Sequence, residues 1–278
     1  KYFKPDFYEQ HEKIMVEYSQ PNTHKEMHVG HMRNVCLGKA VVDLYQYLGH
    51  QVISSTYPGD MGTHVAKCLW YYKKNNLTPP IDRKGAWLGS IYSKAHLELE
   101  SFRGTPTEEK NRIELTAILN EMHSGKGEYF DLWKKTREWS LELMKDVYSW
   151  VNVKFDHWFF ESEVDKKSLE LVQEYFKKGI FVKDDGAIGA DLKEDNLGFC
   201  LLLKTDGNGL YSTKDLELAR YKFENFKITR NIYIVDNRQS LHFKQVFKIL
   251  EKMGFTDLAK NSYHLAYEMV ELPDGAMS

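Results

Sequence analysis

The chain is organised around residues 14–22, IMVEYSQPN, and residues 28–31, HVGH. The first stretch begins with apolar and β-prone residues, which are typical of a buried strand, before a loop at Pro21. After the second stretch, apolar residues recur at helical spacing until Gly49, which favours a helix end: Met32, Val35, Leu37, Ala40, Val41, Leu44 and Leu48. A strand, a loop and a helix in this order place free N–H groups and the positive end of the helix dipole at residues 28–31. The pattern therefore indicates a phosphate site.

Three residues at this predicted helix start suit a nucleotide. Gly30 has no Cβ, so a flat ring or a phosphate can approach its backbone closely. His28 and His31 are three residues apart, so we expect their imidazoles to share one helix face and to point at one ligand. Taken alone, an HxGH motif favours the simpler interpretation of two histidines that cap and pack a helix.

The rest of the chain alternates strands and helices. We expect right-handed crossovers and a parallel sheet, because strands and helices of these lengths alternate along the chain. The fold class predicted is α/β, with a Rossmann-like, doubly wound parallel sheet. The further strands expected are 51–56, 155–160, 232–235 and 264–269, and the further helices are 63–74, 168–178, the one opened by 210–215, and 239–253.

Two stretches depart from this alternation. Residues 75–150 are rich in charge and helical pattern, with helix from 87 to 120, a helix start after Pro106 and a further helix over 129–150. We interpret 75–150 as a helical insertion within a single domain that spans 1–278. Residues 180–192 and 199–204 are predicted to form a hairpin, with a turn at Asp185-Gly186.

Composition excludes several classes of protein. With 278 residues and 42% hydrophobic content the chain can bury a large core, and its net charge of −2 gives no global attraction to nucleic acid. No apolar run approaches the roughly 20 residues of a membrane helix. Cys36, Cys68 and Cys200 lie far apart and predict neither a zinc site nor a disulfide framework, so we expect a cytoplasmic protein. Because the chain starts at Lys1 and ends within a motif, we expect it to be part of a longer protein.

Several segments together resemble the arginyl members of the class I aminoacyl-tRNA synthetases. Residues 17–22, EYSQPN, followed by Lys25 and the HVGH segment, resemble the family's first signature. LYSTKD at 210–215 and IYIV at 232–235, followed by QSLHF at 239–243, resemble two later motifs. Residues 269–278 resemble the approach to the second signature. The segments are collinear over nearly the whole chain, and each alone would be weak.

The resemblance implies a set of site residues. Arginine's planar cation would be held by Glu17 and Asp215 with Tyr211 beside them, while Asn22 and Gln239 would face the α-amino group. ATP would be bound by residues of the first signature, of the QSLHF motif and of the approach to the second signature: His28, Gly30, His31, His242, Met269 and Val270. For His242, a satisfied core histidine is an equally good interpretation.

Lys25 completes the expected catalytic group with His28 and His31. Family members that lack part of the second signature tend to carry a lysine at this position. In this chain, Ala276 occupies the place of the first lysine of the second signature. Two further departures affect the expected pocket. Gln20 stands where many members have serine, and Met61 stands where tryptophan is common.

The resemblance implies ATP-dependent activation of L-arginine and its transfer to tRNA(Arg), with Mg²⁺ accompanying ATP and no zinc or other protein-bound metal. We expect a monomer without a membrane anchor, and we expect this chain to contain neither the family's N-terminal accessory domain nor its C-terminal anticodon-binding domain. Two alternatives stay open at this point. One is another class I synthetase such as a cysteinyl enzyme, and the other is a non-catalytic paralogue that binds arginine or RNA.

Overall fold

The computed structural model describes residues 11–268, 271–272 and 275–276. These residues form two compact units. The sheet unit comprises the described residues of Lys1–Ser19, Val29–Tyr57 and Phe155–Ser278. The helical unit comprises Gln20–His28 and Pro58–Lys154. The chain therefore leaves the sheet unit twice, once between the predicted strand and the HVGH segment and once after residue 57.

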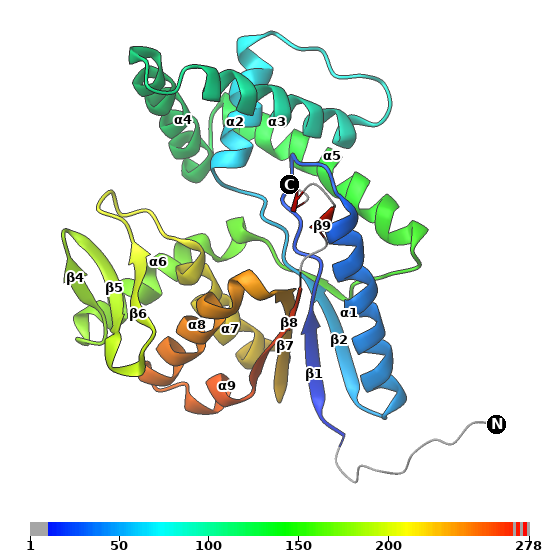
Figure 1. The fold of residues 1–278 in the computed structure, drawn as a ribbon, viewed down its shortest axis with the longest axis vertical. Helices are drawn as coiled ribbons and strands as arrows, with labels where there is room; N and C mark the ends of the chain where they lie inside the picture. The colour runs from blue at the N-terminus through cyan, green and yellow to red at the C-terminus, as the bar shows by residue number, and fades with distance from the viewer. Residues whose placement is uncertain (1–10, 269–270, 273–274, 277–278) are drawn as a thin grey trace. The chain divides into compact units, whose positions relative to one another are not determined.

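A five-stranded parallel sheet forms the centre of the sheet unit (Figure 1). Its strand order is β3-β2-β1-β7-β8, so β1 lies in the middle, where the order of connections reverses. In such sheets, ligands bind beyond the carboxyl ends of the strands at this reversal. The predicted fold class is confirmed. The strands are β1 Lys13–Glu17, β2 Gln51–Thr56, β3 His157–Trp158, β7 Arg230–Asp236 and β8 Ser262–Tyr267.

Helices flank this sheet. Met15 of β1 clusters with Leu218 of α7, whereas the ring of Tyr18 lies against Gly38 of α1, so the two helices contact opposite sides of the chain at β1. The helices are α1 Val29–Tyr47, α6 Glu161–Lys177, α7 Tyr211–Phe226, α8 Ser240–Lys252 and α9 Thr256–Lys260, with 3₁₀ turns η1 Lys193–Asp195 and η2 Asn237–Gln239.

A smaller antiparallel sheet packs with α6, α7 and α8. It consists of β4 Val182–Asp184, β5 Ala187–Leu192 and β6 Gly198–Leu203. Its inner face forms a hydrophobic cluster with those helices, in which buried side chains of β5, β6 and the three helices meet: Val172, Leu192, Leu202, Leu216 and Ile249. Two short strands, β9 Glu271–Leu272 and β10 Gly275–Ala276, pair with each other.

The helical unit contains α2 Thr63–Lys74, α3 Lys84–Ser101, α4 Pro106–Ser124 and α5 Glu128–Trp150. Aromatic side chains form much of its core, because Trp70 and Trp133 pack among α2, α4 and α5 while Trp139 packs with α2 and α3. This unit includes α2 as well as the predicted 75–150 segment. Its loop 20–28 joins Gly59 through a bridge at Asn22.

Several boundary predictions are wrong. Helix α6 begins at Glu161 rather than Ser168, because acidic residues that suit a first turn precede the apolar pattern. The strand predicted over 155–160 is reduced to β3. Helix α1 begins at Val29, so His28 precedes it and the two histidines do not share a helix. The turn at Asp185-Gly186 is confirmed, but it joins β4 to β5, and β6 is a third strand.

Among the described residues, no helix combines the length and apolarity that crossing a membrane requires.

Candidate functional site

The carboxyl end of β1 carries a buried ion pair. Glu17, the last residue of the strand, accepts a hydrogen bond from Lys222 of α7, and the two residues are 3% and 0% exposed. The Lys222 ammonium group also lies over two aromatic rings, 5.2 Å from the centroid of Phe159 and 4.7 Å from that of Tyr233. A buried charge of this kind is stable only when an opposite charge neutralises it. The sequence analysis did not identify Lys222.

Tyr233 of β7 is subject to the charges of both Glu17 and Asp215. Tyr233 pairs with Glu17 in the register of the parallel sheet. Burial raises the pKa of its hydroxyl well above the ordinary value, and the charges of Glu17 and Asp215 raise it further. Both predicted arginine-binding acids therefore act electrostatically on one buried hydroxyl, which places them in the same part of the sheet unit.

Asp215 is bonded to His242, another predicted site residue. The His242 Nε2 atom lies 2.6 Å from the Asp215 carboxylate, and its Nδ1 atom lies 3.4 Å from the hydroxyl of Ser212. Burial lowers the pKa of His242, but the Asp215 carboxylate raises it by more, so the net shift is upward. The carboxylate thus stabilises the protonated imidazole, and the imidazole in turn orients the carboxylate.

Tyr211 and Gln239 are both solvent-accessible. Tyr211 is the first residue of α7 and is 65% exposed. Gln239 ends η2 and is exposed, and that turn is capped by Asp236, which accepts a hydrogen bond of 3.0 Å from the Arg238 backbone. One turn along α7, Lys214 donates to Glu161 over 3.0 Å, so Lys214 is occupied by the neighbouring helix.

Asn34 fixes the start of α1 to the strand ends. Its carbonyl oxygen accepts a 2.6 Å hydrogen bond from the Ser19 backbone, and its amide donates to the Ile234 carbonyl and to the Tyr267 hydroxyl, each over 2.8 Å. Gly30 and His31 lie in the first turn of the same helix. A buried asparagine with bonds to the residue that follows β1 by two positions and to β7 and β8 was not predicted to have this role.

The other predicted residues lie in the helical unit. Asn22 bridges to Gly59, and the Lys25 ammonium group lies 4.7 Å from the centroid of the Tyr92 ring. His28 is exposed at the end of the loop. The structure therefore brings Glu17, Asp215 and His242 together in the sheet unit and places Asn22, Lys25 and His28 on one loop of the helical unit. Met269 and Val270 lie outside the described residues.

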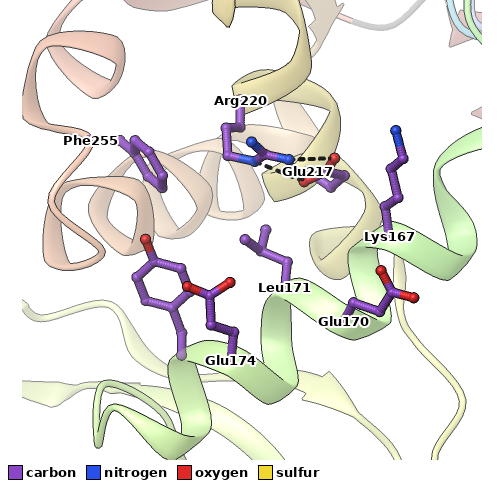
Figure 2. Close-up of a pocket in the computed structure, with 8 residues that line it drawn as sticks. Lys167, Glu170, Leu171, Glu174, Glu217, Arg220 and Phe255 are labelled. Carbon is purple, nitrogen blue, oxygen red and sulfur yellow. Dashed lines mark hydrogen bonds and ion pairs between the residues drawn. The ribbon is translucent and has the colours of Figure 1, made fainter.

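A pocket of about 380 Å³ lies elsewhere in the sheet unit, lined by α6, α7 and Phe255 (Figure 2). Within it, Arg220 donates hydrogen bonds to Glu217 over 2.8 to 3.0 Å. None of the predicted site residues lines this pocket. Across the described part of the chain, no group of three or more histidine, cysteine or acidic side chains is arranged to hold a metal ion.

Comparisons with known proteins agree with the sequence resemblance. The family described as tRNA synthetases class I (R), catalytic domain, matches residues 4–277. An arginine–tRNA ligase of Bdellovibrio bacteriovorus is 59% identical over 278 residues, which are 100% of this chain and 48% of that protein. One from Treponema denticola is 33% identical over 271 residues, covering 95% of this chain and 45% of that protein. The chain thus spans about half the length of the curated relatives it matches.

Solved structures share the fold. Thermus thermophilus arginyl-tRNA synthetase has a TM-score of 0.74 at 23% identity and covers 97% of this chain and 50% of its own. Arginyl-tRNA synthetase from Plasmodium falciparum has a TM-score of 0.76 at 20% identity, and the match covers 95% of this chain and 44% of that one.

Proposed function

Because this chain belongs to the class I tRNA synthetase (R) catalytic-domain family, we propose that it is the catalytic part of an arginine–tRNA ligase. The observation that carries the proposal is the 59% identity with an arginine–tRNA ligase over the whole chain. The proposed reaction uses ATP to activate L-arginine as arginyl-adenylate, with release of pyrophosphate, and then transfers the arginyl group to tRNA(Arg). The match to the class I (R) family argues against the alternative of a cysteinyl enzyme.

The reaction has two steps. The arginine carboxylate attacks the α-phosphorus of ATP, which forms arginyl-adenylate and releases pyrophosphate. A terminal ribose hydroxyl of the tRNA then attacks the activated carbonyl carbon, which forms the ester and releases AMP. Neither step needs a covalent bond to the protein, so the side chains have to position the reactants and stabilise developing charge.

We assign the arginine side chain to the acids of the sheet unit. Asp215, oriented by His242, and Glu17 would hold the guanidinium group, and the exposed ring of Tyr211 would lie along it. Lys222 already takes one oxygen of Glu17. His242 takes one oxygen of Asp215 as well, but the Asp215 side chain is 23% exposed whereas Glu17 is 3% exposed, so we propose Asp215 as the principal acceptor. Gln239 and Asn22 are the proposed partners of the α-amino group.

We assign the ATP phosphates to the residues around the start of α1. His28, His31 and Lys25 would face the triphosphate, and Gly30 would lie under the adenine. Contacts of His242, Met269 and Val270 with ATP stay predictions, and the observed partner of His242 is Asp215. Mg²⁺ would be held largely by the phosphates of ATP.

Two organisational assignments accompany this proposal. We propose that the helices between β2 and β3 are an insertion within the catalytic domain, and that the full-length protein adds accessory and anticodon-binding domains. A cytoplasmic, monomeric enzyme is expected. The non-catalytic alternative is favoured by one observation, because Ala276 replaces the first lysine of the second signature.

Pyrophosphate exchange by the full-length protein, with arginine and tRNA(Arg) present, tests the proposal. We expect exchange in the wild type and a loss of about 100-fold in His28→Ala and in His31→Ala, because each contact to the transition state is worth about 3 kcal/mol. Arginine affinity, measured by calorimetry, should change little. His123→Ala, at an exposed histidine in the last turn of α4, is the matched control and should leave exchange intact.

An inactive wild type would favour the non-catalytic alternative. An active wild type with two fully active histidine variants would show that the ATP assignment is wrong.

A further inference from the structure

His24 is a buried histidine in the loop that carries Asn22, Lys25 and His28. It is 0% exposed, and its backbone lies in the left-handed region with φ of 62°. Its Nδ1 atom lies 2.9 Å from the Thr23 hydroxyl and its Nε2 atom 2.7 Å from the Thr136 hydroxyl of α5. Its backbone N–H donates to the Ser140 hydroxyl over 3.0 Å. One residue thus connects the loop to two turns of α5.

The imidazole is neutral. Burial, with a smaller contribution from the charge of His64, lowers the pKa of His24 from 6.5 to about 3. A neutral imidazole has one donor nitrogen and one acceptor nitrogen, and hydroxyl groups can serve either of them. The hydroxyls of Thr23 and Thr136 therefore satisfy the ring completely, and the connection does not change across neutral pH.

The neighbours of His24 also contact the helical unit. The Thr23 backbone donates to the Gly59 carbonyl over 2.9 Å. Glu26 lies so close to α3 that a Cβ added at Gly89 would come within 2.3 Å of its Cγ atom. Asn22 bridges to Gly59, and the Lys25 ammonium group lies over the Tyr92 ring. Each residue from 22 to 26 therefore has a partner in this unit. The loop is therefore held as part of the helical unit.

We propose that His24 is a positioning residue whose bonds to Thr136 and Ser140 hold the loop that carries Lys25, the residue assigned above to the ATP phosphates. The inference rests on the proposed function. His24 itself has no contact with substrate in this assignment. Its left-handed backbone turns the chain immediately before Lys25, and the bonds to α5 maintain that conformation. Small displacements of a phosphate-binding group reduce the rate of adenylyl transfer strongly, because catalysis here depends on position.

Thr136→Val is the most direct test, because it removes the hydroxyl that bonds His24 and retains the shape of the side chain. Thr116→Val is the matched control. Both threonines donate to the carbonyl four residues earlier in their own helix over 2.8 Å, but Thr116 lies on the exposed side of α4. In the full-length protein we expect Thr136→Val to lower the kcat of arginine-dependent pyrophosphate exchange about tenfold, with KM for arginine nearly unchanged. Thr116→Val should leave both constants unchanged.

Two further measurements separate positioning from stability. In a Lys25→Ala background, Thr136→Val should lower kcat by about twofold or less, because the effects of substituting two residues that act through one another do not add. His24→Asn should also lower kcat while leaving KM for arginine nearly unchanged, as we expect for Thr136→Val. A lower Tm with wild-type kcat in both Thr136→Val and His24→Asn would overturn the proposal, as would full additivity with Lys25→Ala. Wild-type exchange activity in the same assay shows that the proposed function holds independently of that outcome.

Discussion

His24 in the helical unit and His242 in the sheet unit are both held by oxygen atoms of other side chains, yet their pKa values shift in opposite directions. His24 lies between two neutral hydroxyls, and burial lowers its pKa to about 3. His242 lies against the Asp215 carboxylate, which outweighs the effect of burial and raises its pKa. The chemical nature of the partner, neutral or charged, decides the protonation state.

The difference extends to the regions around the two histidines. In the sheet unit, ion pairs surround the residues assigned to arginine, as Glu17 with Lys222 and Asp215 with His242 show. In the helical unit, neutral hydrogen bonds hold the loop assigned to the phosphates. A site that binds a cation needs carboxylates, and buried carboxylates need positively charged partners when no substrate is bound. A loop that only has to be held in place needs no charge.

The largest expected effect concerns the charged region. Lys222→Met leaves Glu17 buried without its partner, and breaking a buried pair costs about 3–5 kcal/mol of unfolding free energy. Lys178→Met is the control, because Lys178 pairs with Glu174 over 2.6 Å on the exposed surface of α6. Urea denaturation should show a large loss for the first variant and little change for the second. Equal losses would contradict the importance of the buried pair.

The second effect concerns the neutral region. The folded pKa of His24 is lower than its unfolded value of 6.5, so the unfolded chain binds more protons between pH 6.5 and about 3. Its contribution to stability is present above pH 6.5 and is lost as the pH falls, by up to about 1.4 kcal/mol per pH unit.

Tryptophan fluorescence can follow this loss, because the helical unit contains five of the six tryptophans: Trp70, Trp87, Trp133, Trp139 and Trp150. His24→Asn should flatten the dependence of the urea midpoint on pH between 6.5 and 4. A variant that keeps the wild-type slope would show that His24 does not titrate in this way.

The smallest effect has the opposite sign. Because the folded pKa of His242 is raised, its contribution to stability is present below pH 6.5 and is lost as the pH rises through the folded pKa. Asp215→Asn should lower the pKa of His242, which an NMR titration of its ring protons can measure. An unchanged or higher pKa in the variant would contradict the assigned pairing. The partial exposure of both groups limits the associated change in stability.

Most of the fold could be predicted from sequence because its elements carry strong periodic patterns. The bounds predicted for β2 and α2 agree with the structure to the residue, and the alternation of apolar segments predicted the parallel sheet. The short helix α9 and the polar first turns of α6 were not predicted. Helix α9 has five residues, and α6 begins seven residues before its apolar pattern becomes regular.

The partners of the site residues could not be predicted in the same way. Lys222 lies 205 residues after Glu17, and His24 lies 112 residues before Thr136. A weaker signal was present in both cases. Lys222 lies four residues after Leu218, on the buried side of α7, where a lysine indicates a buried counter-charge. Thr136 and Ser140 likewise share the buried side of α5, where hydroxyls indicate a polar partner.

Amino-acid selectivity in pyrophosphate exchange tests the central claim most directly. The full-length protein would be assayed with tRNA(Arg) and, in turn, with arginine, lysine and citrulline, the last of which has arginine's shape without its charge. We predict exchange with arginine alone, because carboxylates placed for a planar cation reject a neutral isostere and fit a compact ammonium poorly. Asp215→Asn should abolish most of the exchange with arginine. Exchange with citrulline or lysine at a rate similar to that with arginine would contradict the claim that this chain selects arginine through Glu17 and Asp215.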